Sequence, residues 1–449
     1  MKIKFLGAAG TVTGSSYVLT SGSGRSVLID LGMFQGLPEI DKLNYLPYEY
    51  DCSTLSGAIL THAHLDHCGR LPILVPRGFK GDIWMTPSTK DLTALSLMDS
   101  ARIATEDKTK VLYDQQLAEK TITYFKTIDY RRAFQVGDFR ISMRDAGHIL
   151  GSAILEIEDL KSDTPLKKLV FSGDLGNTPE DLTKETEMID SADVVVMEST
   201  YGDRQHPDAD PAEMIQSEIN AVETLGGTLL IPAFALERTQ ELLHIIMHLK
   251  EEGKVKSETP IILDSPMAEK ATEIYMDYPD VFNHHIQNDF KRGSLFNFPG
   301  LEIIMRSAQS EAIHRRKGPK VILAGSGMMT GGRVVHHAKR LLPLATTRLL
   351  IVGYQGEGTL GRELMEGKKE VVIEGIRIQV MAKVSVTHAM SSHADQSQLL
   401  TWLGHIKNVK KVFLTHGEDT SRIALSERIK NELNIIKIDL PLLNQEITF

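Results

Sequence analysis

The chain has 449 residues, 42% hydrophobic and 24% charged, and its 35 glycines follow no three-residue period, so it is neither disordered nor collagen-like. Fifty Lys and Arg against 59 Asp and Glu give a net charge of −9, which excludes a global positive field for nucleic acid; any polyanion site must be local. No stretch of about eighteen apolar residues predicts a membrane span, and the N-terminus turns polar too soon for a signal peptide.

Two cysteines, Cys52 and Cys68, cannot build a disulfide framework or a four-thiolate zinc site. We therefore expect a cytoplasmic protein with no membrane partner. The length is compatible with two or three domains.

The first half of the chain alternates short Val/Ile/Leu-rich runs with turn clusters, which is typical of strands. The predicted strands are Lys2–Leu6, Tyr17–Thr20, Val27–Asp30, Ala58–Thr61, Ile83–Thr86, Phe139–Arg144, Ala153–Glu158, Lys168–Ser172 and Asp193–Glu198. The clearest helical pattern in this half covers Thr89–Ile103.

The rhythm changes at about Pro211, where helical stretches begin to alternate with buried-type strands. These strands are Gly227–Ile231, Ile261–Asp264, Val321–Ala324 and Arg348–Val352. A βα alternation predicts a parallel sheet. Short strands return after about Lys383, at Lys383–Thr387 and Lys411–Thr415, so we expect one domain interrupted by another.

A dense group of metal-ligand side chains follows the apolar run Ala58–Leu60. His62, His64, Asp66 and His67 lie within six positions, although the whole chain has only 16 His. A strand that delivers imidazoles and a carboxylate onto one loop can serve two metal ions. A chance surface cluster is the alternative, and the density of the group disfavours it.

One loop cannot complete two metal sites, so further ligands are expected after other strands at the same sheet edge. His148, Asp174 and His416 each stand beside a glycine at a predicted strand-to-loop junction, where backbone crowding is least. Each is a weak signal alone, but together with the first loop they form a consistent set.

These motifs closely resemble the metallo-β-lactamase superfamily and, within it, the β-CASP nucleases. The HxHxDH motif stands at His62, His64, Asp66 and His67; further superfamily positions stand at Asp30, His148 and Asp174; the β-CASP positions stand at Glu198, His393 and His416. The resemblance covers essentially the whole chain, including the segments 232–238, 325–329 and 358–362.

The resemblance implies an α/β fold, a four-layer αβ/βα sandwich interrupted by an inserted β-CASP α/β domain. The implied boundaries are 1–205 and 383–449 for the two parts of the metallo-β-lactamase domain and 206–382 for the insertion. The expected cofactors are two zinc ions. One is held by His62, His64 and His148, the other by Asp66, His67 and His416, and Asp174 bridges both. Asp30 is expected to support the ligand loop by hydrogen bonding, or else to be a strand-end turn residue.

The resemblance also implies a catalytic pair that acts with Asp174. His393 is the expected general acid for the leaving 3′ oxygen, and Glu198 is expected to hold its protonated form. The alternative for His393 is a residue of the helix N-cap neighbourhood, with Ser392 as the cap.

A local basic patch is predicted in the window 321–365, which carries five basic and two acidic residues, a charge of +3. A Gly-rich turn precedes a helix there, and backbone N–H groups at such a turn can hold phosphate. The candidate phosphate and RNA-binding residues are Ser326, Gly327, Thr330, Arg333, His336, Arg340 and Ser392. His337 falls on the same predicted polar face. A tight turn and a solvated helix face are the alternatives.

Several other histidines are expected at the surface: His244, His248, His284 and His285. We expect them to carry no chemistry.

The predicted function is zinc-dependent hydrolysis of RNA phosphodiester bonds, as in the polyadenylation-endonuclease and RNase J type, with endonuclease and 5′–3′ exonuclease modes both open. Single-stranded RNA is the expected partner, and a homodimer is left open. His416 favours RNA, because the DNA-repair branch typically has Val there, but a DNA nuclease stays an alternative. So do a lactonase or thioesterase and a non-enzymatic RNA-binding scaffold.

Overall fold

The computed structural model describes residues 1–106, 111–177, 182–284, 286–291, 293 and 295–449. His285, expected at the surface, lies outside them. Backbone contacts divide the described residues into two units. Unit 1 comprises Met1–Gln35, Glu39–Gln205 and His393–Phe449, and unit 2 comprises Gly36–Pro38 and His206–Ser392.

Unit 1 contains two seven-stranded sheets. The first runs β22 (Glu446–Thr448), β1 (Lys2–Phe5), β2 (Ser16–Thr20), β3 (Ser26–Leu31), β4 (Leu55–Ile59), β5 (Ile83–Met85) and β6 (Phe125–Thr127). The second runs β21 (Ile438–Asp439), β20 (Lys411–Leu414), β11 (Val194–Met197), β10 (Lys168–Phe171), β9 (Ala153–Asp159), β8 (Phe139–Asp145) and β7 (Phe134–Val136).

The two sheets of unit 1 pack face to face, because alternate residues of their strands share one buried core. Ile29 and Phe5 of the first sheet belong to the same cluster as Leu155 and Phe413 of the second. Helices cover the outer faces: α2 (Leu65–Cys68), α3 (Pro87–Glu106) and α4 (Gln115–Ile122) on the first, and α12 (Gln396–His405) and α13 (Asp419–Leu433) on the second. The predicted four-layer αβ/βα sandwich is confirmed.

Unit 2 is built around a six-stranded sheet whose neighbouring strands are all parallel. Its order is β14 (Leu301–Ile303), β13 (Ile261–Asp264), β15 (Lys320–Ala324), β12 (Thr228–Pro232), β16 (Thr347–Ile351) and β19 (Lys383–Val386). A hairpin of β17 (Glu370–Ile373) and β18 (Ile376–Gln379) stands apart from this sheet. The predicted parallel sheet is therefore present.

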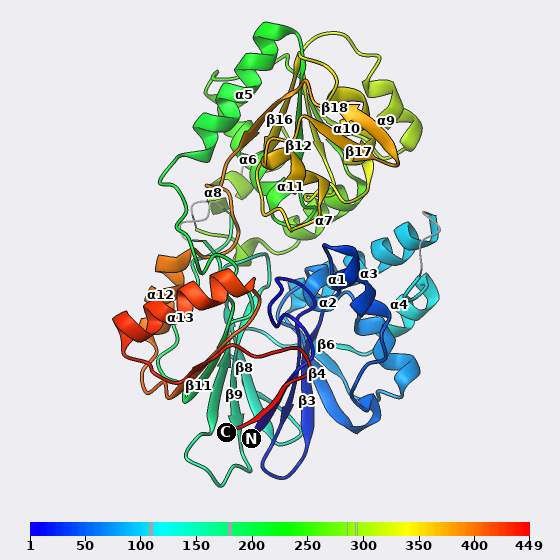
Figure 1. Cartoon of the computed structure of the whole chain (residues 1–449). Helices are drawn as coiled ribbons and strands as arrows, with labels where there is room; N and C mark the ends of the chain where they lie inside the picture. The colour runs from blue at the N-terminus through cyan, green and yellow to red at the C-terminus, as the bar shows by residue number, and fades with distance from the viewer. Residues whose placement is uncertain (107–110, 178–181, 285, 292, 294) are drawn as a thin grey trace. The chain divides into compact units, whose positions relative to one another are not determined.

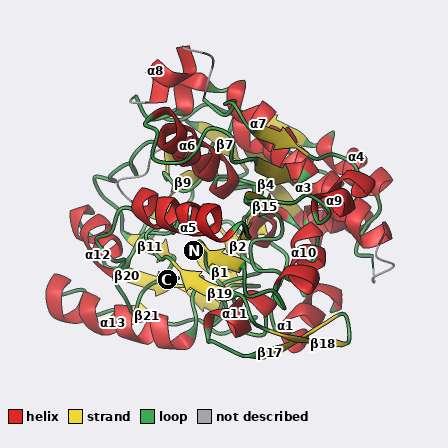
Figure 2. Cartoon of the chain, turned by 90° about the horizontal axis from the view of Figure 1, so that it is seen from above, coloured by secondary structure: helices red, strands yellow, loops and turns green. Residues whose placement is uncertain are grey.

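Helices surround the sheet of unit 2. They are α5 (Pro211–Leu225), α6 (Arg238–Glu251), α7 (Pro266–Met276), α8 (Ile286–Lys291), α9 (Ser307–Ile313), α10 (Arg333–Leu341) and α11 (Leu360–Met365). Figure 1 shows α5 and α10 on opposite sides of the sheet, and Figure 2 shows α5 and α6 near each other. The buried core under α10 combines Val334 and Ala338 with Ile322 and Leu349 of the strands.

Four 3-10 turns and one short helix complete the described elements: α1 (Pro38–Asp41), η1 (Lys42–Tyr45), η2 (Cys52–Thr54), η3 (Leu71–Arg77) and η4 (Pro279–Val281). None of the helices in the described part of the chain combines the length and the hydropathy needed to cross a membrane.

The end of unit 2 differs from the predicted boundary at 382. β19 forms parallel pairs with β16, with Arg348 opposite Lys383 and Ile351 opposite Val386. Because these hydrogen bonds make β19 an edge strand of the six-stranded sheet, unit 2 continues to Ser392. The expectation that Lys383–Thr387 returns to the first domain was therefore wrong.

Candidate metal centre

The carboxyl ends of several strands of unit 1 meet at one edge and deliver the candidate ligands. β3 and β4 are parallel, and so are β10, β11 and β20. β8 and β10 both pair antiparallel with β9, so they run in the same direction. The residues that follow these strands are Asp30 at the end of β3, the loop His62–His67 after β4, His148 after β8, Asp174 after β10, Glu198 after β11 and His416 after β20.

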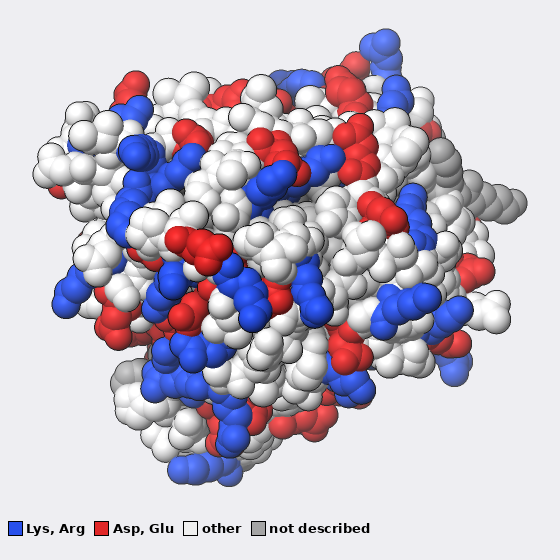
Figure 3. Space-filling view, turned by 90° about the horizontal axis from the view of Figure 1, so that it is seen from below, with Lys and Arg blue, Asp and Glu red and all other residues white. Residues whose placement is uncertain are grey.

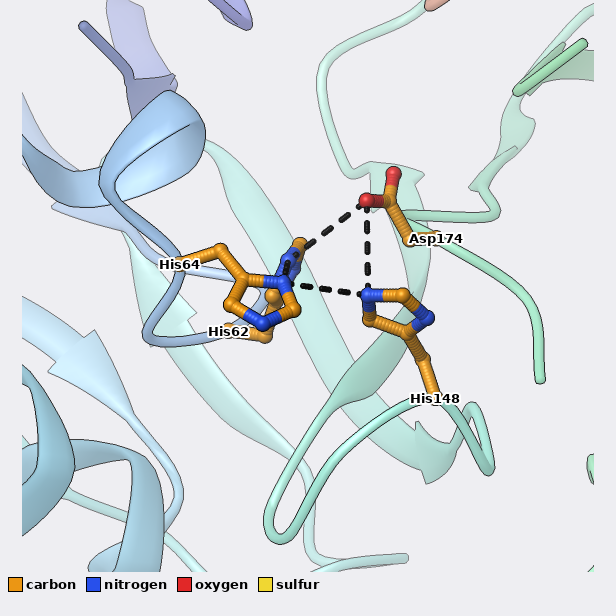
Figure 4. Close-up of side chains that lie close together, drawn as sticks. All are labelled: His62, His64, His148 and Asp174. Carbon is orange, nitrogen blue, oxygen red and sulfur yellow. Dashed lines mark hydrogen bonds and ion pairs between the residues drawn. The ribbon is translucent and has the colours of Figure 1, made fainter. Parts of the chain in front are cut away.

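Three imidazoles gather around Asp174 in the first group (Figure 4). His62 Nε2 lies 3.2 Å from His64 Nδ1, and His148 Nε2 lies 3.1 Å from the same atom. Asp174 Oδ2 lies 3.5 Å from His62 Nε2 and 3.7 Å from His148 Nε2. The structure therefore brings these three histidines and the aspartate together at one point.

The second group shares the same aspartate. Asp174 Oδ2 lies 3.3 Å from His67 Nε2 and 3.7 Å from His416 Nε2. His416 Nε2 is 3.5 Å from Asp66 Oδ2, and Asp66 could also share an ion with His62 and His67. Asp66, His67 and His416 thus surround the other side of Asp174.

The spacing around Asp174 fits metal coordination better than hydrogen bonding. One carboxylate oxygen has four imidazole nitrogens at 3.3 to 3.7 Å, all longer than an ordinary charge-assisted hydrogen bond. Ligands about 2.0–2.1 Å from a tetrahedral zinc ion lie about 3.3–3.4 Å from one another. Asp174 Oδ1 is buried and has no hydrogen-bond partner among the described residues. The residues present therefore fit a pair of metal ions that share Asp174.

Three oxygen atoms hold the Nδ1 side of the ligand imidazoles. Asp30 Oδ2 accepts a hydrogen bond from His67 Nδ1 at 2.8 Å, Thr61 Oγ1 lies 3.1 Å from His62 Nδ1, and Thr200 Oγ1 lies 3.1 Å from His416 Nδ1. An oxygen partner at Nδ1 fixes the ring and leaves Nε2 for a metal. Asp30 also accepts from the Thr61 backbone N–H at 2.8 Å, so its carboxylate is hydrogen-bonded to the residue that precedes the candidate ligand loop.

Burial and mutual charge set the protonation of the ligands. Burial lowers the pKa of His62 well below its usual value and that of His64 to about 4, so both rings are neutral at neutral pH, as metal ligands must be. Burial would raise the pKa of Asp174, but the neighbouring His416 and His67 lower it well below its usual range. Burial would lower the pKa of His67 as well, but the charges of Asp174 and Asp30 raise it well above its usual value. At neutral pH the site without metal therefore presents two neutral rings, His62 and His64, to an ionised Asp174, and a metal ion would have to displace the proton of His67.

His393 and Glu198 lie beside this centre as a hydrogen-bonded pair. His393 Nδ1 is 3.2 and 3.1 Å from the two carboxylate oxygens of Glu198, and the side chain of Glu198 is buried. The Leu175 backbone N–H donates to Glu198 Oε1 at 2.6 Å, which fixes the carboxylate. Burial alone would lower the pKa of His393, but the charge of Glu198 raises it to about 9, so the ring is protonated at neutral pH.

The backbone places His393 next to the metal-ligand strands. Ala394 N–H donates to the Leu175 carbonyl at 2.8 Å, and His393 forms an isolated bridge with Gly176. The helix that follows is capped by Asp395, whose side chain accepts from Gln398 N, and not by Ser392. The alternative role for His393, as a neighbour of a Ser392 cap, is therefore incorrect.

Arg333 does not lie on an exposed basic face, which corrects the sequence prediction. Its guanidinium forms an ion pair with Asp264 and donates to the carbonyls of Ile304 and Met305, the latter two at 2.7 Å. His337 is buried and lies 2.7 Å from Asp264. Asp264, a fully buried carboxylate at the end of β13, pairs with both Arg333 and His337 and holds them inside unit 2. Of the four residues on the predicted polar face, the two that are exposed are His336 and Arg340.

Several polar groups of the Gly-rich turn form hydrogen bonds within the turn itself. The backbone N–H groups of Ser326 and Thr330 donate to Gly331 O and to Ser326 Oγ, at 3.2 and 3.0 Å. Adding a Cβ at Gly327 would bring it within 2.6 Å of Phe234, so close packing of the turn requires glycine there. Ser392 Oγ accepts a hydrogen bond from Arg238 Nη2 at 2.6 Å. Ser326, Thr330 and Ser392 therefore have partners within unit 2.

Thr61 and Thr200 were missed by the sequence analysis as orienting residues. Both adjoin quoted motifs, Thr61 immediately before the ligand loop and Thr200 two residues after Glu198. In the sequence, only the position of a hydroxyl residue next to a ligand motif could have indicated this role. The contact itself could not be predicted locally, because Thr200 and His416 are 216 positions apart.

Comparisons with known proteins agree with this architecture. Three family models match: the Metallo-beta-lactamase superfamily over residues 9–139, the Beta-Casp domain over 239–364, and the Zn-dependent metallo-hydrolase RNA specificity domain over 377–441. Ribonuclease TTHA0252 of Thermus thermophilus is 36% identical over 95% of both chains. The chain therefore belongs to the metallo-β-lactamase superfamily and, within it, to the β-CASP family.

Two more distant relatives and one solved structure were also compared. RNase aCSPSF2 of Saccharolobus solfataricus is 30% identical over 99% of this chain and 85% of its own, and Transcription termination factor FttA of Methanosarcina mazei is 29% identical over 97% and 70%. A protein of unknown function from Enterococcus faecalis superposes with a TM-score of 0.54 over 99% of both chains at 10% identity, which shows a shared fold.

Proposed function

We propose that the protein is a zinc-dependent ribonuclease that hydrolyses RNA phosphodiester bonds in RNA processing or decay, as an endonuclease, a 5′–3′ exonuclease or both. The observation that carries the proposal is the single oxygen Asp174 Oδ2 within 3.7 Å of four imidazole nitrogens, with the His393–Glu198 pair beside it. Two of the relatives are named as ribonucleases, and their similarity spans nearly the whole chain.

The proposed metal ligands follow the two groups around Asp174. His62, His64 and His148 would hold one zinc ion, Asp66, His67 and His416 the other, and Asp174 both. When bound, such ions activate a water molecule near neutral pH and stabilise the charge that develops on phosphorus. Asp30, Thr61 and Thr200 orient the ligand rings.

His393 is proposed as the general acid for the leaving 3′ oxygen. Glu198 accepts the Nδ1 proton, so the Nε2 proton is the one available to the leaving group. The raised pKa of about 9 keeps this proton in place at neutral pH. A lactonase or thioesterase needs no acid of this kind, which favours the nuclease over those alternatives.

The proposed RNA contacts lie in the Gly-rich turn and on the exposed face of α10: Ser326, Gly327, Thr330, His336 and Arg340. Ser392, which precedes His393 in the chain, is a further proposed contact. Basic and acidic side chains are interspersed on the face seen in Figure 3. Single-stranded RNA is the proposed substrate and the cytoplasm the proposed location. Cys52 and Cys68 are both free and buried, which agrees with a reducing compartment.

One assay tests the proposal against its alternatives. The protein is incubated with 5′- and 3′-labelled single-stranded RNA, matched DNA and a panel of lactones and thioesters, each with zinc and after chelation. We expect zinc-dependent cleavage of RNA, and the order of labelled products separates internal cleavage from 5′–3′ degradation. Cleavage of DNA alone, or of the small esters alone, would reject the proposal.

Replacing Thr200 by Val is expected to lower zinc affinity by about 10- to 100-fold, because the change removes the oxygen that orients His416 while it keeps the size of the side chain. Zinc is titrated against a competing chelator. Thr401→Val is the control, since Thr401 is an exposed helix residue that bonds its own helix backbone. Equal affinities in the three proteins would remove Thr200 from the metal centre.

Replacing Arg340 by Glu is expected to weaken single-stranded RNA binding and to reduce the log–log salt slope by about 0.7, the change for one lost phosphate contact. Arg340 is exposed on α10. Lys270→Glu, an equal charge change at an exposed position of α7, is the control. The slope is read from RNA-binding isotherms at several salt concentrations, and an equal slope in both variants would assign Arg340 to plain solvation. Arg333→Glu is unsuitable, because it would place two carboxylates together at Asp264.

A further inference from the structure

A second cluster of metal-ligand side chains lies in unit 2. His244 and His248 stand one turn apart on α6, so both side chains leave the same face of the helix, and Asp289 comes from α8. Their side chains are 6%, 37% and 17% exposed, respectively. The expectation that His244 lies at the surface was wrong, because α6 turns it toward α8.

The three side chains converge on one point through single atoms. His244 Nε2 lies 3.0 Å from His248 Nε2, and Asp289 Oδ2 lies 3.6 Å from the first nitrogen and 3.4 Å from the second. Nitrogen and oxygen ligands at about 2.0–2.1 Å from a tetrahedral ion are about 3.3–3.4 Å apart. The triangle of donor atoms therefore matches three corners of such a site.

The surroundings of His248 suit a ligand. Its Nδ1 lies 3.5 Å from Glu251 Oε2, one turn further along α6. A carboxylate at the second ring nitrogen orients a metal-binding imidazole and strengthens its donor nitrogen. A divalent cation placed between these side chains would be in reach of both Nε2 atoms and of the Asp289 carboxylate.

We propose that His244, His248 and Asp289 bind a divalent cation of the zinc class, with a fourth position left for water. Two imidazoles and one carboxylate are suitable for Zn²⁺ and also for Ni²⁺ or Co²⁺. The ion clamps α8 onto α6. Because α8 has only six residues, too few for a stable isolated helix, such a clamp has a direct structural use. All three ligands are in unit 2, outside the centre formed by unit 1.

Metal counting tests the proposal. The wild type, His248→Ala and Asp289→Asn are equilibrated with zinc, freed of excess ion and analysed by elemental analysis. Each variant is expected to hold one ion fewer per chain than the wild type and to keep its ribonuclease activity. His405→Ala, which removes an exposed imidazole from the last turn of α12, is expected to match the wild type.

Anomalous diffraction locates the ion. A zinc-soaked crystal of the wild type, measured on both sides of the zinc absorption edge, is expected to show a peak within about 2.2 Å of His244 Nε2, His248 Nε2 and Asp289 Oδ2. Equal metal content in the wild type and both variants, or a crystal with no peak at this position, overturns the proposal. The test compares variants with the wild type, so it gives its answer even if the centre at Asp174 holds fewer ions than proposed.

Discussion

Replacing Asp174 by Ala is expected to abolish measurable cleavage of RNA, a loss of at least about 10³-fold, because the proposed metal pair would supply several kcal/mol of transition-state stabilisation. A single oxygen of this side chain lies 3.3 to 3.7 Å from four ligand imidazoles, so its removal affects both sites together. Zinc content should fall in the same preparation. Initial rates on labelled RNA and elemental analysis measure the two effects.

The matched control for Asp174→Ala is Asp193→Ala. Asp193 is a carboxylate of the same sheet that accepts hydrogen bonds from Lys167 and Lys168 backbone N–H groups, at the opposite end of the strands from the ligands. Its replacement is expected to leave the zinc content unchanged. An Asp174→Ala protein that kept both ions and its activity would show that the four imidazoles bind metal without a bridging carboxylate.

Replacing His393 by Ala is expected to lower activity on RNA by about 10²- to 10⁴-fold, the usual share of general acid–base catalysis, while the zinc content stays unchanged. The defect should shrink on a diester whose leaving group is p-nitrophenolate, because that group departs without a proton. Parallel rates on the two substrates give the comparison. Glu198→Gln should show the same pattern more mildly, since it removes the charge next to His393 and leaves the acid in place.

The variant His416→Ala distinguishes the effect of losing a metal ligand from the effect of losing the general acid. Loss of a ligand loosens one metal ion, so both substrates should suffer equally and zinc content should drop. If His393→Ala also lost zinc, or impaired both substrates alike, His393 would be a ligand or a substrate-positioning group. The proton for the 3′ oxygen would then come from another residue.

Much of the fold could be predicted because the strands of this chain carry strong local signals. The predicted strand at Ile261–Asp264 has the observed bounds, and the helix predicted at Thr89–Ile103 lies within α3 (Pro87–Glu106). The short edge strands β6 (Phe-Lys-Thr) and β7 (Phe-Gln-Val) were missed, because neither contains the Val/Ile/Leu-rich run that marks the predicted strands. The predicted domain boundary after residue 382 was wrong because the sequence of β19 is compatible with a strand in either unit. Only its pairing with β16 shows that it belongs to unit 2.

The candidate ligand residues could be placed at strand ends from the sequence, but the direction in which a long side chain points could not be predicted. Arg333 has the position of an exposed helix residue, yet Asp264, 69 residues earlier, pairs with it. Likewise, helical spacing puts His244 and His248 on one face of α6, but nothing local reveals that Asp289 approaches that face. Such contacts depend on how the elements pack, and packing is not encoded within a window of a few residues.

The interruption of unit 1 by residues 206–392 has a consequence for synthesis on the ribosome. β11 pairs in parallel with β20, and Val194 lies opposite Lys411. This pairing can form only after Lys411 has been synthesised, and the proposed ligand His416 is synthesised after that. Apart from Gly36–Pro38, unit 2 is continuous in the chain, and its sheet can be completed while the last strands of unit 1 are still unmade. Nascent chains stalled before β20 should therefore hold six of the seven proposed ligands and lack only His416, so the metal centre stays unfinished. The enzyme would then become able to cut RNA only near the end of its own translation.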